Sequence, residues 1–247
     1  MDYRQRIYQN YVTSRHESFA PTGVDGFKSR APYFRHVIQH YFPIDKNVNI
    51  LEIGCGHGAF IYFICASGYQ NVTGIDRSPE QVSEARRLGI AKVEHGDLMP
   101  KLLSLPAESI DVLLAFDVIE HLRKEEAILL AEQAYRVLRH GGRLILHTVN
   151  ADSPFFGANR YGDFTHEIAF NKASMGQLLM SSGFTVVSCY EDAPVVHGLK
   201  SFVRMILWKV LRSMLRFFSA VETGDSGCDA VLTRNFLTVA EKRVARQ

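Results

Sequence analysis

The chain has 247 residues, of which 47% are hydrophobic and 22% charged, and its formal net charge is +2. This composition is typical of a globular protein with one large α/β domain, and the small charge gives no indication of nucleic-acid binding. The four cysteines are scattered without a CxxC pair, which argues against a disulfide framework or a zinc site. The polar N-terminal stretch does not resemble a secretory signal. No run of ~18 apolar residues indicates a spanning helix, so we expect a cytoplasmic protein.

From residue 48 onward, short β-rich runs alternate with longer helical runs. The expected strands lie at 48–54, 71–76, 92–97, 110–116, 142–149, 184–191 and 235–242. The expected helices lie at 58–67, 79–88, 123–139 and 173–182, with Ser78 as N-cap of the second and Gly141-Gly142 ending the third. This alternation predicts a doubly wound α/β fold, with a mostly parallel sheet, helices on both faces and a ligand beyond the carboxyl ends of the strands.

A glycine-rich segment between the first strand and the first helix is the most informative motif. It reads Leu51-Glu52-Ile53-Gly54-Cys55-Gly56-His57-Gly58. Glycines at this place let the backbone pass close to a ligand, and the helix N-terminus offers free N–H groups to an anion. A dinucleotide fingerprint would place the third glycine three residues after the second, whereas Gly58 comes two after Gly56.

Further motifs follow the next three strands. Asp76 ends the second strand, where a carboxylate can accept hydrogen bonds from both hydroxyls of a ribose. Gly96-Asp97-Leu98 follows the third strand, and Phe116-Asp117-Val118-Ile119-Glu120-His121-Leu122 follows the fourth. Together with the glycine segment, these motifs resemble those of class I S-adenosylmethionine-dependent methyltransferases over about residues 48–150.

The resemblance implies that the chain binds S-adenosyl-L-methionine. The residues that it assigns to the cofactor are Glu52, Gly54, Cys55, Gly56, Gly58, Asp76, Arg77, Asp97, Leu98, Phe116, Asp117, Val118 and His121. It also implies one Rossmann-like domain with a seven-stranded sheet whose last strand is antiparallel. We divide this domain into a helical N-terminal lid (1–45), a cofactor-binding core (46–191), a helical insertion (192–230), and the final strand and tail (231–247). Tyr8, Tyr11, Arg30 and Tyr33 of the lid are candidates to close over the cofactor.

Methyl transfer from a sulfonium is an in-line displacement, so the enzyme positions the acceptor and controls its protonation. The segment 160–167, RYGDFTHE, resembles a D-P-T-H segment of methyltransferases encoded with glycan-assembly enzymes, with Phe164 in place of the proline. We therefore expect His166 to act as the base, with Asp163 or Glu167 orienting it. Alternatively, His166 only caps or tethers its own loop. For His121 two interpretations stay open: it is the base, or it is a helix-start residue hydrogen-bonded to the backbone.

Two other histidines are expected to have structural roles. His57 is expected to shape the glycine segment, and His147 to be a hydrogen-bonded histidine in the core or at its rim. No cluster has a convincing metal-ligand spacing, so we predict no metal.

The acceptor is expected to be a sugar hydroxyl of a surface polysaccharide or a lipid-linked glycan. Two alternatives stay open. A phenolic or quinone-precursor molecule could stack on the aromatic residues of the 150–172 loop, which are Phe155, Phe156, Tyr161 and Phe164. A non-catalytic protein could use the cofactor site as a scaffold. A nucleic-acid acceptor is not expected, and the sequence does not indicate an oligomeric state.

Residues Leu199–Ser219 form a basic amphipathic segment within the expected insertion. Its apolar face comprises Leu199, Phe202, Val203, Ile206, Leu207, Val210, Met214 and Phe217, and its cations are Lys200, Arg204, Lys209, Arg212 and Arg216. One interpretation is a core-facing or dimer-forming helix. The other is an interfacial helix that contacts anionic lipid or a lipid-linked substrate at the inner membrane face.

Overall fold

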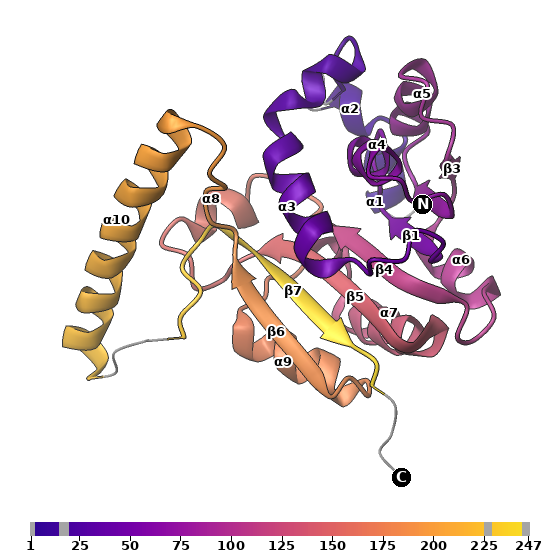
Figure 1. Ribbon diagram of the computed structural model, residues 1–247. Coiled ribbons are helices and arrows are strands. Elements are labelled where there is room, and N and C mark those ends of the chain that lie inside the picture. The colour runs from indigo at the N-terminus through magenta and orange to yellow at the C-terminus, as the bar shows by residue number, and fades with distance from the viewer. Residues whose placement is uncertain (1–2, 15–19, 225–228, 244–247) are drawn as a thin grey trace.

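The computed structural model describes residues 3–14, 20–224 and 229–243, and it contains a seven-stranded sheet flanked by helices (Figure 1). The strands are β1 (Ile50–Ile53), β2 (Val72–Asp76), β3 (Val93–His95), β4 (Ile110–Phe116), β5 (Leu138–Val149), β6 (Val186–Glu191) and β7 (Asn235–Glu241). Their order in the sheet is β3-β2-β1-β4-β5-β7-β6. Strands β1 to β5 run parallel, and β7 is antiparallel to both β5 and β6. The predicted fold class is confirmed.

Helices cover both faces of the sheet. On one face lie α3 (Ala31–Tyr41), α4 (Ala59–Ala66) and α5 (Pro79–Arg87), and on the other lie α6 (Leu98–Ser104), α7 (Lys124–Val137) and α9 (Lys172–Ser181) (Figure 1). The central strand β4 shows why: Leu113 packs in one core and Leu114 in the other, and both side chains are fully buried. Successive side chains of a strand point to opposite faces, so a strand with apolar residues at every position needs a helical layer on each side.

Short helices lie near the carboxyl ends of the parallel strands. They are α1 (Tyr3–Tyr8), α2 (Tyr11–Ser14), α8 (Phe156–Arg160) and the 3₁₀ helices η1 (Val24–Ser29) and η2 (Ile119–His121). Helices α6 and α8 were not expected from the sequence. Helix α6 begins where the Asp97 side chain accepts a hydrogen bond from the Met99 N–H, at 3.2 Å. Helix α8 divides the segment 150–172, which the sequence analysis treats as one loop.

The predicted start of the helix at 79–88 is confirmed, whereas the predicted end of the helix at 123–139 is wrong. Ser78 caps α5 by accepting a hydrogen bond from the Gln81 N–H. Helix α7, however, ends at Val137, and Leu138 is already extended and fully buried in β5. Gly141 and Gly142 therefore lie inside the strand, where the pairing of β5 with β4 shifts register. Glycine in a strand commonly marks such an irregularity.

Helix α10 (Leu199–Thr223) follows β6 and lies apart from the sheet (Figure 1). All its residues are described, and Ser201 alone is buried. The core-facing interpretation of this segment is therefore wrong. No helix in the described part of the chain is long and apolar enough to span a bilayer.

Candidate functional site

The glycine segment forms the tight turn between β1 and α4. Gly54, Gly56 and Gly58 all have positive φ angles, of 67°, 55° and 79°. A Cβ at Gly54 would lie 2.3 Å from the Val118 side chain, so this glycine lets the turn after β4 approach β1. A Cβ at Gly56 would lie no closer than 3.8 Å to a neighbouring side chain, so the space on this side of the turn is open to a ligand.

Gly58 has a packing role. A Cβ at this position would lie 2.9 Å from the Val93 side chain and 3.0 Å from that of Ile90. The start of α4 therefore approaches β3 closely only because Gly58 has no side chain. Gly58 does not line either of the two cavities described below, unlike the other residues predicted to bind the cofactor.

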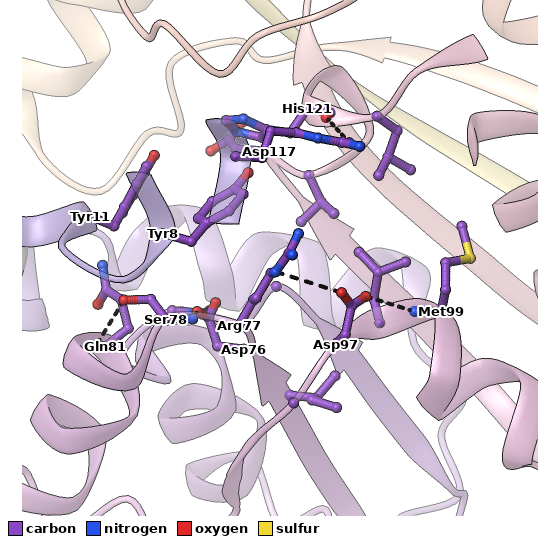
Figure 2. A pocket seen from close by; sticks show the side chains of 18 of the residues that line it. Tyr8, Tyr11, Asp76, Arg77, Ser78, Gln81, Asp97, Met99, Asp117 and His121 are labelled. Carbon is purple, nitrogen blue, oxygen red and sulfur yellow. Dashed lines mark hydrogen bonds and ion pairs between the residues drawn. The ribbon is translucent and has the colours of Figure 1, made fainter. Parts of the chain in front are cut away.

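A smaller cavity of about 210 Å³ lies between the carboxyl ends of the strands and helices α1 and α2 (Figure 2). Most of the predicted cofactor residues line it: Gly54, Gly56, Asp76, Arg77, Asp97, Leu98, Asp117, Val118 and His121. Tyr8 and Tyr11 cover it from the N-terminal side. Its walls thus bring together residues from all four sequence motifs.

Asp76 connects two sides of the smaller cavity. Its Oδ2 accepts a hydrogen bond from the Gly56 N–H at 2.7 Å, and its Oδ1 accepts one from the Ser78 N–H at 2.8 Å. Burial raises the pKa of this carboxyl. Each carboxylate oxygen has a second lone pair, so Asp76 can still accept hydrogen bonds from a ligand such as a ribose.

Arg77 and Asp97 also line this cavity, and the dashed line between them in Figure 2 marks their ion pair. Their charged groups approach to 3.6 Å, and the Arg77 guanidinium lies 5.5 Å from the centre of the Tyr8 ring. Asp97 is held in place as the N-cap of α6. The unexpected helix α6 thus fixes a residue that the sequence predicted.

A larger cavity of about 1090 Å³ adjoins the first, and the two share Gly54, Gly56, Gln81 and Asp117. Three further predicted cofactor residues, Glu52, Cys55 and Phe116, line this second space. Arg30 and Tyr33 of the N-terminal segment also line it. On its outer side the cavity is bounded by four residues of α10, which are Arg204, Leu207, Trp208 and Leu211.

Glu52 carries a buried polar atom that lacks a partner within the described structure. The Glu52 Oε2 forms no hydrogen bond there, although the side chain is almost completely buried. Burial and then the nearby Asp76 charge raise the pKa of this carboxyl to about 8. An unpaired acid beside the glycine segment fits a ligand that carries an ammonium group, as the methionine part of S-adenosylmethionine does.

His147 holds Asp117 at the boundary of the two cavities. Its Nδ1 lies 2.7 Å from Asp117 Oδ1, its Nε2 lies 3.5 Å from Asp192 Oδ2, and its ring stacks on Phe116. Burial opposes protonation, but the two carboxylates outweigh it and raise the pKa of His147 to about 10. His147 is buried and hydrogen-bonded, as expected for a structural histidine. Asp117, its partner, has a positive φ of 54°.

His121 is linked to Asp163 through Thr165. The Thr165 hydroxyl donates to Asp163 Oδ1 at 2.7 Å and lies 2.8 Å from His121 Nδ1. Because the Thr165 hydroxyl donates its proton to Asp163, it can only accept a hydrogen bond from the imidazole. The imidazole proton is therefore on Nδ1, and Nε2 carries a lone pair. Burial lowers the pKa of His121 to about 4, so the ring is neutral near pH 7.

Asp163 is anchored from the N-terminal segment. Its Oδ2 accepts a hydrogen bond from the Tyr11 hydroxyl at 2.7 Å. Burial opposes ionisation, but the hydrogen bonds from Thr165 and Tyr11 outweigh it and lower the pKa of Asp163 to about 2. Asp163 is therefore a permanent anion at neutral pH, directed through Thr165 toward His121.

His166 lies beside His121, with 4.7 Å between the ring centres, but it lines neither cavity. Its Nδ1 is hydrogen-bonded to the Asn159 carbonyl at 3.0 Å, and burial lowers its pKa. Arg160 donates to the carbonyl groups of His166 and Glu167, and the Glu167 carboxylate accepts from Tyr3. His166 therefore tethers its own loop, as one of the two sequence interpretations expects.

Three side chains in this region are close enough to hold a metal ion. Ligand atoms of Glu120, His121 and His166 lie within 4.8 Å of one another. Glu120 also accepts a hydrogen bond from Thr148, and burial raises its pKa to about 8. The sequence did not reveal this grouping, because His166 reaches it only when its loop folds back over the sheet. The absence of a metal stays a prediction.

Sequence reasoning missed three residues of the site. Thr165 is fully buried between Asp163 and His121, Asp192 contacts His147, and Arg4 lines the smaller cavity. Arg4 forms two hydrogen bonds of 2.7 Å with the Glu126 carboxylate and donates to the His121 carbonyl at 3.2 Å. Arg4 and Asp192 belong to no local motif. Thr165 lies in the 160–167 segment, but no role was predicted for it.

Cys55, Cys65 and Cys189 are free cysteines, and burial raises the pKa of each thiol. Cys228 lies outside the described residues.

Comparisons with known proteins agree with this geometry. A family model described as a methyltransferase domain matches residues 27–189. A probable S-adenosylmethionine-dependent methyltransferase of Mycolicibacterium smegmatis is 34% identical over 152 residues, which are 61% of this chain and 56% of that protein. A tRNA U34 carboxymethyltransferase of Shewanella baltica is 34% identical over 166 residues, 63% of this chain and 49% of that protein. The chain thus spans about half the length of the curated relatives it matches.

Solved structures show the same fold at low identity. A methyltransferase from Archaeoglobus fulgidus has a TM-score of 0.63 and 19% identity, over 88% of this chain and 97% of that one. Haemonchus contortus phosphoethanolamine N-methyltransferase 2, solved with S-adenosylhomocysteine, has a TM-score of 0.64 and 14% identity, over 96% of this chain and 61% of that one. With the family match and the four motifs gathered around two adjoining cavities, the chain belongs to the class I S-adenosylmethionine-dependent methyltransferases.

Proposed function

We propose that this methyltransferase transfers a methyl group to an oxygen, namely a sugar hydroxyl of a surface polysaccharide or lipid-linked glycan. The observation that carries the proposal is the hydrogen-bonded series from Asp163 through Thr165 to His121 in the wall of the smaller cavity. A hydroxyl is a poor nucleophile and needs a base, whereas a neutral imidazole with a free Nε2 can serve as one. A cytoplasmic location, a lid role for residues 1–45 and a peripheral membrane contact through residues 199–219 belong to the same proposal.

The roles of the residues follow from their environments. S-adenosylmethionine supplies an electrophilic methyl group. His121 Nε2 takes the proton of the acceptor hydroxyl. At the same time the hydroxyl oxygen bonds to the methyl carbon, and the carbon–sulfur bond of S-adenosylmethionine breaks. The Asp163 anion, acting through Thr165, stabilises the imidazolium that forms. Tyr8 stays protonated, because burial raises its pKa, and with Tyr11 it covers the cavity against water.

The sugar acceptor is supported by the polar lining of the larger cavity. Arg30, Tyr33, Asp192, Arg234 and Asn235 present donors and acceptors from three different parts of the chain. Such a set can hydrogen-bond several hydroxyls of one ligand, and Trp208 offers an apolar surface for a sugar ring. The resemblance of residues 160–167 to a segment from glycan-assembly methyltransferases also supports a sugar acceptor.

A phenolic or quinone-precursor acceptor is the second candidate. The side chains of Phe155, Tyr161 and Phe164 are more than half exposed, so they are available to stack on an aromatic ring. They lie on the same segment as His166. The tRNA named for the Shewanella baltica relative is less well supported here, because the net charge of +2 offers little attraction to a phosphate backbone.

The test is transfer of labelled methyl from S-adenosylmethionine to a panel of acceptors: polyprenyl-diphosphate glycans, free polysaccharide, catechols and tRNA. The wild type is compared with His121→Asn, and the matched control is His40→Asn, which changes an exposed histidine of α3. Label in the glycan fraction that is lost in His121→Asn and retained in His40→Asn supports the proposal. Label confined to catechols or to tRNA would replace the sugar by that acceptor.

A further inference from the structure

Helix α10 turns its mixed polar side toward the body of the protein. Ser201 is buried, and Met205, Trp208, Arg212 and Arg216 are half-buried. Arg212 forms an ion pair of 2.5 Å with the Glu191 carboxylate at the end of β6 and donates to the Ala230 carbonyl at 3.3 Å. The side of α10 that a surface helix normally exposes is therefore the side that this helix attaches to the protein.

The opposite side of α10 carries an apolar stripe that is largely exposed to solvent. At 3.6 residues per turn, its members fall within an arc of about 100°. Their side chains are between 44% and 79% exposed, and they are Leu199, Val203, Ile206, Leu207, Val210, Met214, Phe217 and Val221. A continuous apolar surface of this length marks an interaction site, because single exposed apolar residues are common but rows of them are not.

Cations accompany this stripe, and acids are absent from it. Between Leu199 and Val221 the sequence contains five Lys or Arg residues and no Asp or Glu. On the helical projection, Lys200 and Arg204 border one edge of the stripe and Lys209 lies near the other. This arrangement matches helices that lie in the plane of a bilayer surface, where the apolar side enters the acyl boundary and the cations reach anionic headgroups.

A second copy of the chain fits this surface less well. If two stripes packed together, Lys200, Arg204 and Lys209 of one copy would lie near the same cations of the other. The segment from Leu199 to Val221 has no acid to pair with them. Like charges held together at the edge of an apolar contact oppose association, whereas anionic lipid neutralises them.

The stripe also adjoins the larger cavity. An apolar groove of about 590 Å³ lies between α10 and the Pro154–Phe155 segment, and Met214, Phe217 and Val221 of the stripe line it. Leu211 lines both this groove and the larger cavity. Leu211 thus connects the groove beside α10 with the larger cavity, which the predicted cofactor residues Glu52, Cys55 and Phe116 also line.

We propose that α10 is an interfacial anchor that binds the surface of a bilayer containing anionic phospholipid. Bound in this way, α10 brings the mouth of the larger cavity to the membrane, where an acceptor joined to a lipid can enter it. The second statement rests on the proposed function, whereas the first depends only on the helix. The anchor therefore accounts for an apolar helix face that the described part of the chain leaves uncovered.

The test measures binding of the whole protein to vesicles in the absence of cofactor and acceptor. Sedimentation is compared for vesicles of phosphatidylcholine alone and of phosphatidylcholine mixed with phosphatidylglycerol. Wild type is expected to bind the mixed vesicles and to lose binding at high salt, because the Debye length shortens. Trp208 is the single tryptophan of the chain, so a change in its emission reports a change in the surroundings of α10 on its side toward the larger cavity.

Two pairs of substitutions separate the apolar contribution to vesicle binding from the electrostatic contribution. Val210→Glu with Phe217→Glu is expected to abolish binding, and its control is Ile44→Glu, an apolar side chain that is 95% exposed outside α10. Lys200→Gln with Lys209→Gln is expected to weaken binding about 25-fold, at about fivefold for each cation removed. Its control is Arg86→Gln with Lys124→Gln, two exposed cations elsewhere.

Three outcomes would overturn the anchor. These are equal binding to both kinds of vesicle, unchanged binding of the Val210→Glu, Phe217→Glu protein, or a concentration-dependent dimer that this variant loses. The last result would assign the stripe to a second copy. Because vesicle binding is measured without turnover, its failure leaves the proposed methyl transfer intact, and an inactive acceptor panel leaves the anchor intact.

Discussion

His121 Nδ1 lies 2.8 Å from the Thr165 hydroxyl, although the two residues are 44 positions apart in the chain. The contact joins the turn after β4 to the segment after α8, and Asp163 continues it at 2.7 Å. The Asp163 anion and the proposed base His121 are therefore connected through a single hydroxyl.

The first prediction concerns this connection. Thr165→Val keeps the shape of the side chain but removes the hydroxyl, so the Asp163 charge no longer acts on His121. We expect kcat to fall about 10- to 100-fold, with little change in the Kd of S-adenosylmethionine. Steady-state kinetics and cofactor titration check this.

His166→Gln serves as the comparison for Thr165→Val. His166 contacts the Asn159 carbonyl and lines neither cavity, so we expect a loss of less than about tenfold. A larger loss in His166→Gln than in His121→Asn would return the role of base to His166.

The second prediction is a pH dependence of stability that arises from His121. Its pKa is about 4 in the folded protein, mainly because it is buried, against 6.5 as the usual value. The unfolded chain then binds the proton more readily between these values, so the free energy of unfolding falls as the pH drops from 6.5 to about 4. Urea unfolding at several pH values should show a weaker decline in His121→Asn, by on the order of 3 kcal/mol at the low end. Parallel curves for the two proteins would contradict it.

The third prediction concerns Glu52. Its folded pKa of about 8 lies above the usual 4.5, so the folded protein holds a proton that the unfolded chain releases. Stability from this group is complete below pH 4.5 and is lost as the pH rises toward 8. Glu52→Gln should remove this decline, as measured by thermal unfolding between pH 5 and pH 8.

Glu52 also links cofactor binding to proton release. A bound ammonium group would favour the ionised carboxylate, so binding near pH 7 should release a proton from wild type. Calorimetry in buffers of different ionisation enthalpy detects that proton. We expect Glu52→Gln to release none and to bind S-adenosylmethionine at least about tenfold more weakly, because a charge-assisted contact is lost. Equal proton release by the two proteins would exclude Glu52 as the source.

The fourth prediction separates two glycines by their surroundings. Gly54→Ala would place a methyl group 2.3 Å from Val118 at a positive φ, so we expect it to destabilise the fold by about 2 kcal/mol or more. Gly176 lies in α9 with no atom near its Cβ position, so Gly176→Ala should stabilise by about 0.5–1 kcal/mol. Chemical denaturation measures both, and similar values at the two sites would contradict the steric argument.

The sheet could be predicted from the sequence because its strands are buried apolar runs bounded by turn residues. Strand β4 was expected at residues 110–116 and is found there, since Val112 and Leu114 enter one core and Leu113 and Ala115 enter the other. The end of α7 could not be predicted from Gly141 and Gly142. The burial of Leu138, a tertiary property, starts the strand before the glycines are reached.

The residues of the site likewise fall into those that the sequence predicts and those that depend on tertiary structure. Motif residues such as Asp76 and Asp97 adjoin strand ends, so the parallel sheet alone brings them together. The pairing of His121 with Thr165 depends on how the 150–172 segment returns across the sheet, and no local pattern in the sequence records that path. The same is true of α10, whose amphipathic pattern would look identical if its apolar face were turned inward.

The antiparallel pairing of β6 with β7 has a consequence for α10. Glu191 at the end of β6 is directly opposite Phe236 near the start of β7, so α10 grows out of what is otherwise a β-hairpin. A short turn could close that hairpin while leaving its partner strand β5 paired as before. The helical excursion can therefore change in length or charge without altering the pairing of the sheet, whereas the wall that it adds to the larger cavity changes with it.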